Sequence, residues 1–279
     1  MTVIGGLFGL LLASLTFVSV TYATPSRSFL ASSASREVNE SMEEAIDRHS
    51  VHFLIQPFSE QGTNVYNSKV ESSELNQDVF SQIPEWESFD KLKTLFLTTR
   101  DMRLLKDESH AGLRRITWLY PDDGCFARSS LIHSHSKEKK TQKLENVFVF
   151  GSLTAKTKNH PSGMVYWWYH VAPAARVGQQ VWILDAALEP KGPILFEEWI
   201  GKMGLNKSSY FASFCDQNAY NPTSLCNGDK DPTDAARNDD TNLLDSERSR
   251  IQELGRNPEA ELGDSPPWLQ TLLALVTRL

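Results

Sequence analysis

The stretch PDDGCFARSS, residues 121–130, combines a turn-forming run with a cysteine and a possible helix start. A helix beginning near Phe126 would place Cys125 at its N-terminus, where free backbone N–H groups and the helix dipole favour a thiolate. The same N–H groups can hold a developing oxyanion, and Gly124 lets a substrate approach closely. The pattern predicts a cysteine nucleophile; the alternative is a small buried thiol that happens to begin a helix.

A cysteine nucleophile needs a base, and His170 is the best candidate among the seven histidines. It lies in the strand-like run YWWYHVA, where alternation would put it on one face with Tyr166 and Trp168. Asp185 follows the apolar run VWIL, and it can either accept a hydrogen bond from an imidazole on a neighbouring strand or cap a turn. We predict that Cys125, His170 and Asp185 form a catalytic group.

A metal site is not expected. His133 and His135 form the pair HSH, but two residues that are two positions apart on a helix point in different directions. We therefore expect neither a metal nor an organic cofactor.

The elements that must position these residues are helices and a meander of strands. Residues 86–105 contain apolar positions at helical spacing, and residues 126–139 are compatible with a second helix. Short loops join the last three of the strand-like runs, so they should pair antiparallel. The sequence predicts an α+β fold, an antiparallel sheet packed with helices. The strand-like runs are residues 114–121, 145–155, 164–172 and 179–188.

The N-terminus is typical of an export signal. Residues 3–20 are apolar and uncharged, and Thr21 and Ala23 fit a cleavage site of small residues, which gives a signal peptide at 1–23. An uncleaved membrane anchor is the alternative. Residues 24–80 are interpreted as a pro-region or N-terminal extension. We expect a secreted or periplasmic protein that does not contact the membrane after signal removal.

Export changes the interpretation of the three cysteines, because paired cysteines form bridges in an oxidising compartment. Cys215 and Cys226 have ten residues between them in a loop rich in Asn and Pro, and we expect them to form a disulfide. Cys125 is then left over, which indicates a reactive thiol or an intermolecular link.

The net charge of −7 is concentrated near the C-terminus. Residues 228–264 hold eleven acids and five bases, a balance of −6 that leaves about −1 for the rest. A body without a basic surface argues against nucleic acid as a partner. We interpret residues 228–264 as an acidic flexible linker and residues 265–279 as an amphipathic helix that docks on the body or on a partner.

Four segments in the same order resemble the bacterial protein-glutamine glutaminases, which are secreted protein-deamidating enzymes. These segments are YPDDGCFARSS, FVFGSLTA, WWYHVA, and ILDAAL followed by KGPILFEEW, and they span roughly residues 115–200. The resemblance implies a papain- or transglutaminase-like core in which Cys125, His170 and Asp185 form the triad. Two departures stand out: Pro173 should end strand pairing early, and Ala186 replaces the proline that follows the family's aspartate.

The resemblance predicts a catalytic domain at residues 81–227 that deamidates glutamine in proteins or peptides through a Cys125 thioester. Trp118, Tyr166 and Trp168 would wall a slot for the aliphatic glutamine stem, although aromatic residues are more often core. A transglutaminase and a cysteine protease share the chemistry, and an exported binding or effector module without turnover shares only the fold. We expect a monomer whose partner is a protein or peptide with an accessible glutamine.

Overall fold

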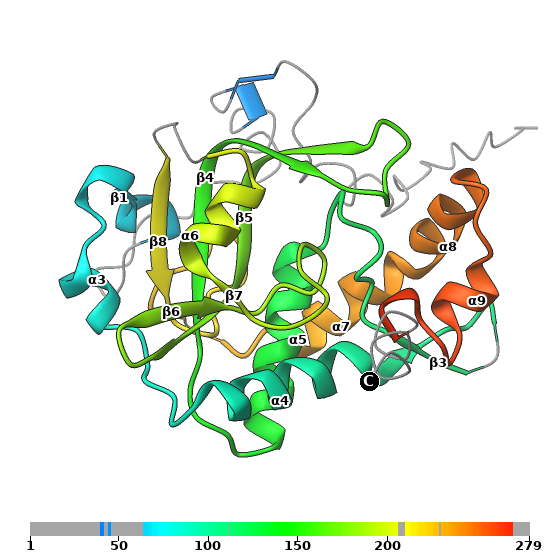
Figure 1. The fold of residues 1–279 in the computed structure, drawn as a ribbon, viewed down its shortest axis with the longest axis horizontal. Coiled ribbons are helices and arrows are strands. Elements are labelled where there is room, and N and C mark those ends of the chain that lie inside the picture. Colours follow the sequence, from blue (N-terminus) through cyan, green and yellow to red (C-terminus); the bar gives the residue numbers. More distant parts are fainter. Residues whose placement is uncertain are drawn as a thin grey trace, which may run out of the picture.

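The computed structural model describes residues 40–41, 44–45, 64–110, 112–205, 210–228 and 230–269. The described chain is an α+β fold, in which helices pack around an antiparallel sheet, as predicted from the sequence (Figure 1). The predicted signal peptide lies outside the described residues, as does most of the predicted C-terminal helix. No helix in the described ranges has the length and apolar character to cross a membrane.

Six antiparallel strands form the main sheet, in the order β1-β8-β4-β5-β6-β7. The long central strands are β4 (Glu145–Lys156) and β5 (Met164–Val177), and they coincide with two of the predicted runs. A separate hairpin pairs β2 (Arg103–Lys106) with β3 (Leu113–Arg115). The outer strands are β1 (Val70–Glu71), β6 (Gln180–Ile183), β7 (Ile194–Leu195) and β8 (Phe211–Cys215).

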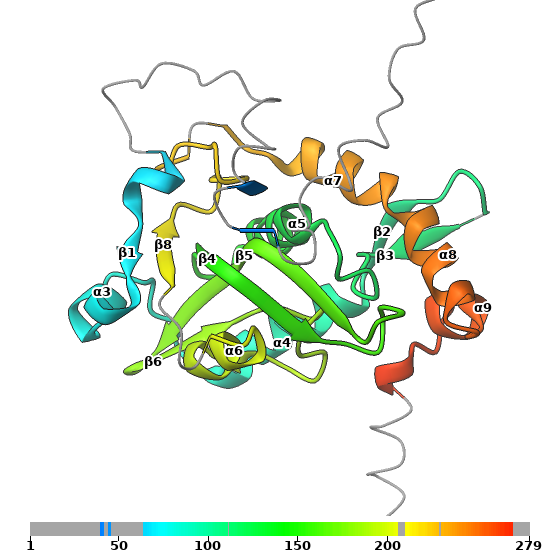
Figure 2. The same cartoon turned by 90° about the horizontal axis from the view of Figure 1, so that it is seen from above.

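Helices cover both faces of the sheet. Seen from above, α5 (Cys125–Glu138) and α6 (Phe196–Lys202) lie on opposite sides of β4 and β5 (Figure 2). The remaining helices are η1 (Val65–Ser68), η2 (Ser72–Glu74), α3 (Gln77–Ser81), α4 (Phe89–Asp101), α7 (Thr233–Asn242), α8 (Leu244–Glu253) and α9 (Pro258–Leu262).

The predicted first helix forms because its local signals agree. The Ser88 side chain accepts a hydrogen bond from the Lys91 amide and so caps the N-terminus of α4. Leu92, Leu95 and Phe96 are buried on one face, where they join the core that α5 and the C-terminal helices share.

The run at residues 114–121 is not the strand that its composition predicts, because β3 ends at Arg115. The backbone amides of Thr117 and Leu119 donate instead to the carboxylates of Asp240 and Glu247. Distant side chains therefore replace the partner strand that β-rich sequence alone would require.

The prediction that Pro173 ends strand pairing is wrong. β5 continues to Val177, and Ala174 pairs with Ile183 of β6. Pro173 lacks an N–H donor, but its carbonyl accepts a hydrogen bond from the Leu184 amide at 2.9 Å, so the strand keeps a partner there.

The predicted acidic linker at residues 228–264 is also wrong, because α7, α8 and α9 occupy most of it (Figure 1). Leu243, Leu244 and Ile251 are buried against the body. Two of the acids, Asp240 and Glu247, are buried as well, at 0% and 2% exposure. Composition suggested a solvated segment, whereas these acids bind partners inside the protein.

The predicted boundary at residues 80/81 does not separate two bodies. β1 pairs with β8, and the Val65 amide donates to the Ser224 carbonyl at 3.0 Å. Phe80 packs edge-on against Phe196 and Phe214. Residues 64–80 are therefore part of the sheet and its core.

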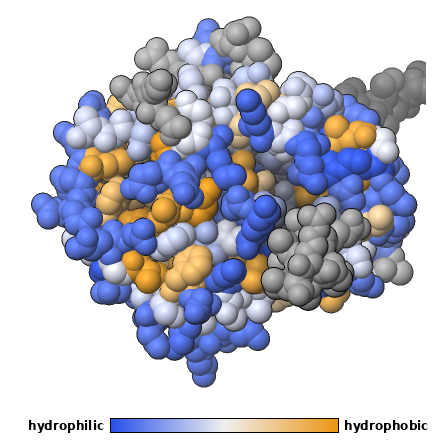
Figure 3. Space-filling model, in the orientation of Figure 1, coloured by the Kyte–Doolittle hydropathy of each residue, from blue (hydrophilic) through white to orange (hydrophobic). Residues whose placement is uncertain are grey.

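One face of the molecule is seen in the space-filling view. On the face shown in Figure 3, polar residues form most of the outline and apolar residues show between them. Among the described residues, Leu113 is the large hydrophobic side chain that is exposed, at 49%.

Candidate active site

Cys125 is the first residue of α5 and is buried, at 7% exposure. Gly124 precedes it with φ +83°, a left-handed conformation that glycine adopts without strain. The Asp123 carboxylate accepts a hydrogen bond from the Gly124 amide at 2.6 Å. Within the described part of the chain no side chain caps this helix, so the N–H groups of its first turn are available to a ligand.

A buried polar network fixes α5 against the sheet. Asn146 of β4 accepts hydrogen bonds from the Ser129 hydroxyl at 2.5 Å and faces the His133 Nε2 at 2.8 Å. The Asn146 amide donates to the Ala219 carbonyl at 2.8 Å. This arrangement ties the helix, β4 and the loop after β8 together, and it sets the position from which Cys125 projects.

His170 and Asp185 form a buried pair in which Nε2 lies 2.7 Å from Oδ2. His170 is on β5, and Asp185 follows the end of β6, so adjacent strands bring the two side chains together. The other Asp185 oxygen, Oδ1, accepts from the amides of Ala187 and Leu188 at 3.1 and 3.3 Å. These donors fix the carboxylate in place.

The pair shifts the pKa of both groups in opposite directions. Burial lowers the pKa of His170, but the charge of Asp185, its hydrogen bond and the Cys125 side chain outweigh burial and raise the pKa to about 9. Burial raises the pKa of Asp185, but His170 and the Trp199 hydrogen bond lower it below its usual value. The imidazole is therefore held in its charged form at neutral pH.

Aromatic rings set the orientation of the imidazole. His170 stacks on Trp167, with ring centroids 4.7 Å apart and an interplanar angle of 12°, and Trp199 lies 5.6 Å away. The indole N–H of Trp199 donates to Asp185 Oδ2 at 2.9 Å. With Nε2 on Asp185, the second ring nitrogen, Nδ1, is left as the atom that can exchange a proton with Cys125.

The structure brings the three predicted residues to one small cavity between α5 and β5. Cys125, His170 and Asp185 all line it, together with Trp118 and Arg128. The indole N–H of Trp118 donates to the Arg100 carbonyl at 3.0 Å.

Tyr166 and Trp168 do not line this cavity. The pairing register between β4 and β5 shifts here, because Phe150 pairs with Tyr169 whereas Leu153 pairs with Trp167. β4 therefore advances by three residues where β5 advances by two. Trp168 consequently packs on the side of Phe150 and Tyr66, with ring centroids at 6.2 and 5.9 Å, and it does not share a face with His170. The expectation of a common face is wrong because this shift breaks the alternation of β5.

Sequence reasoning missed Tyr169, Trp199 and Asp123. Burial raises the pKa of Tyr169 well above its ordinary value, and the neighbouring Cys125, with which it hydrogen bonds, raises it further. Burial likewise raises the pKa of Asp123 to about 8. Trp199 lies in the KGPILFEEW segment, whose motif was the available signal for it.

A group of metal-ligand types lies elsewhere, at the β2–β3 hairpin. Ligand atoms of Asp107, His110 and Asp245 lie within 4.8 Å of one another. Asp107 already accepts from the Arg114 guanidinium at 2.9 Å and from the His110 amide at 3.0 Å. Its oxygens are therefore occupied by protein donors.

A family model described as Glutaminase matches residues 89–203. The resemblance noted in the sequence is confirmed over these residues.

Solved structures of protein-glutaminase are similar over longer stretches. A crystal structure of protein-glutaminase has 26% identity, with 47% of this chain and 73% of that chain covered and a TM-score of 0.37. An NMR structure of protein-glutaminase from Chryseobacterium proteolyticum has 22% identity, coverages of 66% and 92%, and a TM-score of 0.39. A crystal structure of pro-protein-glutaminase has 20% identity, coverages of 83% and 72%, and a TM-score of 0.40. A search of curated proteins found no match.

Proposed function

We propose that this chain hydrolyses the side-chain amide of glutamine residues in proteins or peptides, with Cys125 as nucleophile and with His170 and Asp185 as its partners. The observation that carries the proposal is the 2.7 Å pair of His170 and Asp185, which lines one cavity with a cysteine at the start of a helix. The match to the glutaminase family over residues 89–203 supports the choice of glutamine as substrate.

The reaction follows from the positions of these groups. The Cys125 sulfur attacks the carboxamide carbon, the C–N bond breaks, and His170 gives its proton to the departing ammonia. The backbone N–H groups at the start of α5 stabilise the negatively charged oxygen of the tetrahedral intermediate. Water then gives a proton to His170 and attacks the thioester, which releases glutamate and the free thiol. The core is of the papain- or transglutaminase-like type, and Trp118 borders the slot for the glutamine stem.

The chain functions after export. Cys215 and Cys226 are bonded to one another, a state that persists in oxidising compartments. This bond leaves Cys125 as the free thiol. Protein substrates outside the cytoplasm are consistent with both features, and residues 1–23 supply the export signal.

An N-terminal segment covers the site before activation. Ala45 is fully buried and packs in the same apolar cluster as Cys125, Tyr169 and Trp168. Its amide donates to the Ser41 carbonyl at 3.1 Å. A buried residue of this segment in the cluster that contains Cys125 supports a pro-region role for residues before about 64.

Ammonia release from casein, with mass spectrometry of the product, tests the proposal. Each converted glutamine gains about one dalton, because an amide is replaced by an acid. Cys125→Ala should abolish the release, and a fully active variant would contradict the proposal. Lysine cross-links would indicate a transglutaminase, new chain termini a protease, and no product from folded, processed protein a binding module.

A further inference from the structure

The segment that delivers Cys125 is an irregular loop, residues 116–124, between β3 and α5. Such a loop has no strand partner of its own, so side chains must hold it. From α5, the Arg128 guanidinium donates to the carbonyls of Tyr120 and Asp123, at 3.2 and 2.6 Å. Arg128 is buried, at 3% exposure.

Asp240 of α7 holds the same loop as well. Its Oδ2 accepts from the Thr117 amide at 3.2 Å, and its Oδ1 accepts from the Thr117 hydroxyl at 2.5 Å. The carboxylate is fully buried and replaces the strand hydrogen bond that Thr117 lacks. Next to it, Leu243 packs so closely on Gly124 that a Cβ there would lie 2.5 Å from its Cδ1.

Glu247 and Arg250 of α8 hold two further points of the loop. Glu247 accepts from the Leu119 amide at 2.9 Å and from the Arg114 guanidinium at 3.3 Å. Arg250 binds both carboxylate oxygens of Asp122, at 2.6 and 3.1 Å. Planar two-point pairing of this kind fixes orientation as well as distance.

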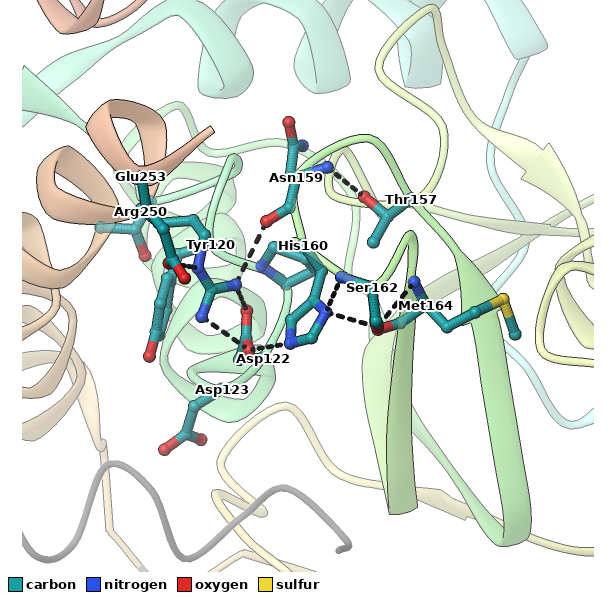
Figure 4. Close-up of polar contacts among 12 residues, drawn as sticks. Tyr120, Asp122, Asp123, Thr157, Asn159, His160, Ser162, Met164, Arg250 and Glu253 are labelled. Atoms are coloured by element: carbon teal, nitrogen blue, oxygen red, sulfur yellow. Dashed lines mark hydrogen bonds and ion pairs between the residues drawn. The ribbon is translucent and has the colours of Figure 1, made fainter. Parts of the chain in front are cut away.

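Figure 4 shows that the Arg250 contact reaches the β4–β5 turn as well. Asp122 lies between Arg250 and His160, whose Nε2 is 3.4 Å from Asp122 Oδ1. Arg250 also donates to the Asn159 carbonyl at 3.2 Å, and its guanidinium lies 5.2 Å from the centre of the Tyr120 ring. One arginine thus joins α8, the loop and the turn that leads into β5, the strand of His170.

We propose that Asp240, Glu247 and Arg250 form a clamp that positions Cys125 against His170. The positioning of Cys125 by the clamp does not depend on the proposed function, whereas the expected effect on turnover does. It lies at residues 240–250, outside the residues 89–203 that match the glutaminase family, so this chain uses its acidic C-terminal helices to complete a site that the matched region begins.

The geometry explains why a clamp is needed. The thiol and the imidazole come from different elements, and displacement of a reacting atom by about 1 Å can cost roughly 10²-fold in rate. Arg128 binds carbonyl groups along the loop, whereas the Thr117 and Leu119 amides and the Asp122 carboxylate are bound from α7 and α8. Loss of these contacts frees the loop but leaves the His170–Asp185 pair intact.

The variants that test the clamp are Asp240→Ala, Asp240→Asn, Glu247→Gln and Arg250→Lys in the full chain. Asp240→Asn keeps one acceptor oxygen and Arg250→Lys keeps the charge without the two-point geometry, so both remain informative if Asp240→Ala fails to fold. Asp234→Asn and Asp245→Asn are the controls, because both residues are exposed acids on the same two helices.

Hydrogen exchange is the first measurement. In Asp240→Ala and Glu247→Gln we expect faster exchange at the amides of Thr117 and Leu119, with the interior of β4 and β5 unchanged. The second measurement is alkylation of Cys125 by iodoacetamide with and without His170→Ala. His170→Ala should change the alkylation rate of Cys125 by roughly tenfold in the otherwise native protein. In the Asp240→Ala variant the same substitution should change it by less than about twofold. A purely structural role would leave this coupling unchanged.

The third measurement is amide hydrolysis, in which we expect the clamp variants to lower kcat by about tenfold or more and to change KM by less than about twofold. Asp240→Asn should retain more activity than Asp240→Ala. The clamp would be overturned if Asp240→Ala and Glu247→Gln kept the hydrogen-exchange rates of the native loop and if His170→Ala changed their alkylation rates as much as it does in the native protein. This conclusion would hold whatever activity the variants show. Absence of amide hydrolysis in the processed protein without these substitutions would overturn the proposed function instead, because exchange and alkylation do not depend on it.

Discussion

Trp199 and His170 bind the same oxygen of Asp185, Oδ2, at 2.9 and 2.7 Å. The indole is fully buried and comes from α6, on the face of the sheet opposite α5. The orientation of the carboxylate is therefore set from one side of the sheet while the thiol is presented from the other. Three elements that are distant in the sequence must pack correctly before the predicted triad exists.

Removal of the indole donor should weaken the site without removing the triad. We expect Trp199→Phe to lower kcat by roughly tenfold, because one of the donors that fix Asp185 is lost, and to cost about 1–3 kcal/mol in the free energy of unfolding. Amide hydrolysis and urea unfolding measure the two effects. Trp182→Phe, at a half-buried indole outside the cavity, is the control.

Asp185→Asn should lower the pKa of His170 from about 9 towards the ordinary value near 6.5, because the charge that raises it is removed while burial remains. NMR titration of the imidazole measures this shift directly. Activity should fall by at least about 10²-fold. An unchanged pKa would show that Asp185 does not control the imidazole.

Stability should depend on pH through the same histidine. The pKa of His170 is raised on folding, so its contribution is fully present below about 6.5 and is lost as the pH rises through about 9. The loss should be on the order of a few kcal/mol. Unfolding in urea at several pH values measures it, and His170→Asn should show a smaller decline between pH 6.5 and 9. Equal declines in both proteins would contradict this assignment.

Gly124→Ala should affect both stability and activity, because φ is +83° and the new Cβ would lie 2.5 Å from Leu243. We expect a loss of about 1–3 kcal/mol and a fall in kcat. Gly163→Ala is a matched control: its φ is +73°, but no atom lies within 4 Å of the added Cβ. It should show the backbone strain without the displacement of Leu243 and with little effect on kcat.

Cleavage between residues 46 and 63, at an engineered protease site, should raise activity several-fold or more once the N-terminal fragment is removed. The reason is that Ala45 packs in the cluster of Cys125, whereas residues from Val65 onwards belong to the sheet. Casein deamidation before and after cleavage measures the effect. Equal activity of the two forms would count against a pro-region.

Local patterns predicted the parts of the fold that local patterns control. β4 and β5 have runs of β-branched and aromatic residues, and α4 and α5 have a cap or a turn at their start, so their positions followed from the sequence. The three residues Cys125, His170 and Asp185 followed from chemistry and motif, and they line one cavity.

The predictions from the sequence were wrong where residues that are distant in the chain determine the local structure. The shift between Phe150 and Leu153 depends on how β4 meets β5, and nothing within the run of β5 reports it. The acids of residues 228–264 resemble a solvated linker in composition, because Thr117, Leu119 and Arg114, the partners of Asp240 and Glu247, lie more than a hundred residues earlier in the chain. A buried carboxylate cannot be distinguished from an exposed one by composition alone.

The Cys215–Cys226 bond closes a loop whose Ala219 carbonyl holds Asn146, and Asn146 in turn fixes α5. Reduction of this bond would leave that carbonyl on an open stretch of chain, so α5 would lose one of the anchors from which Cys125 projects.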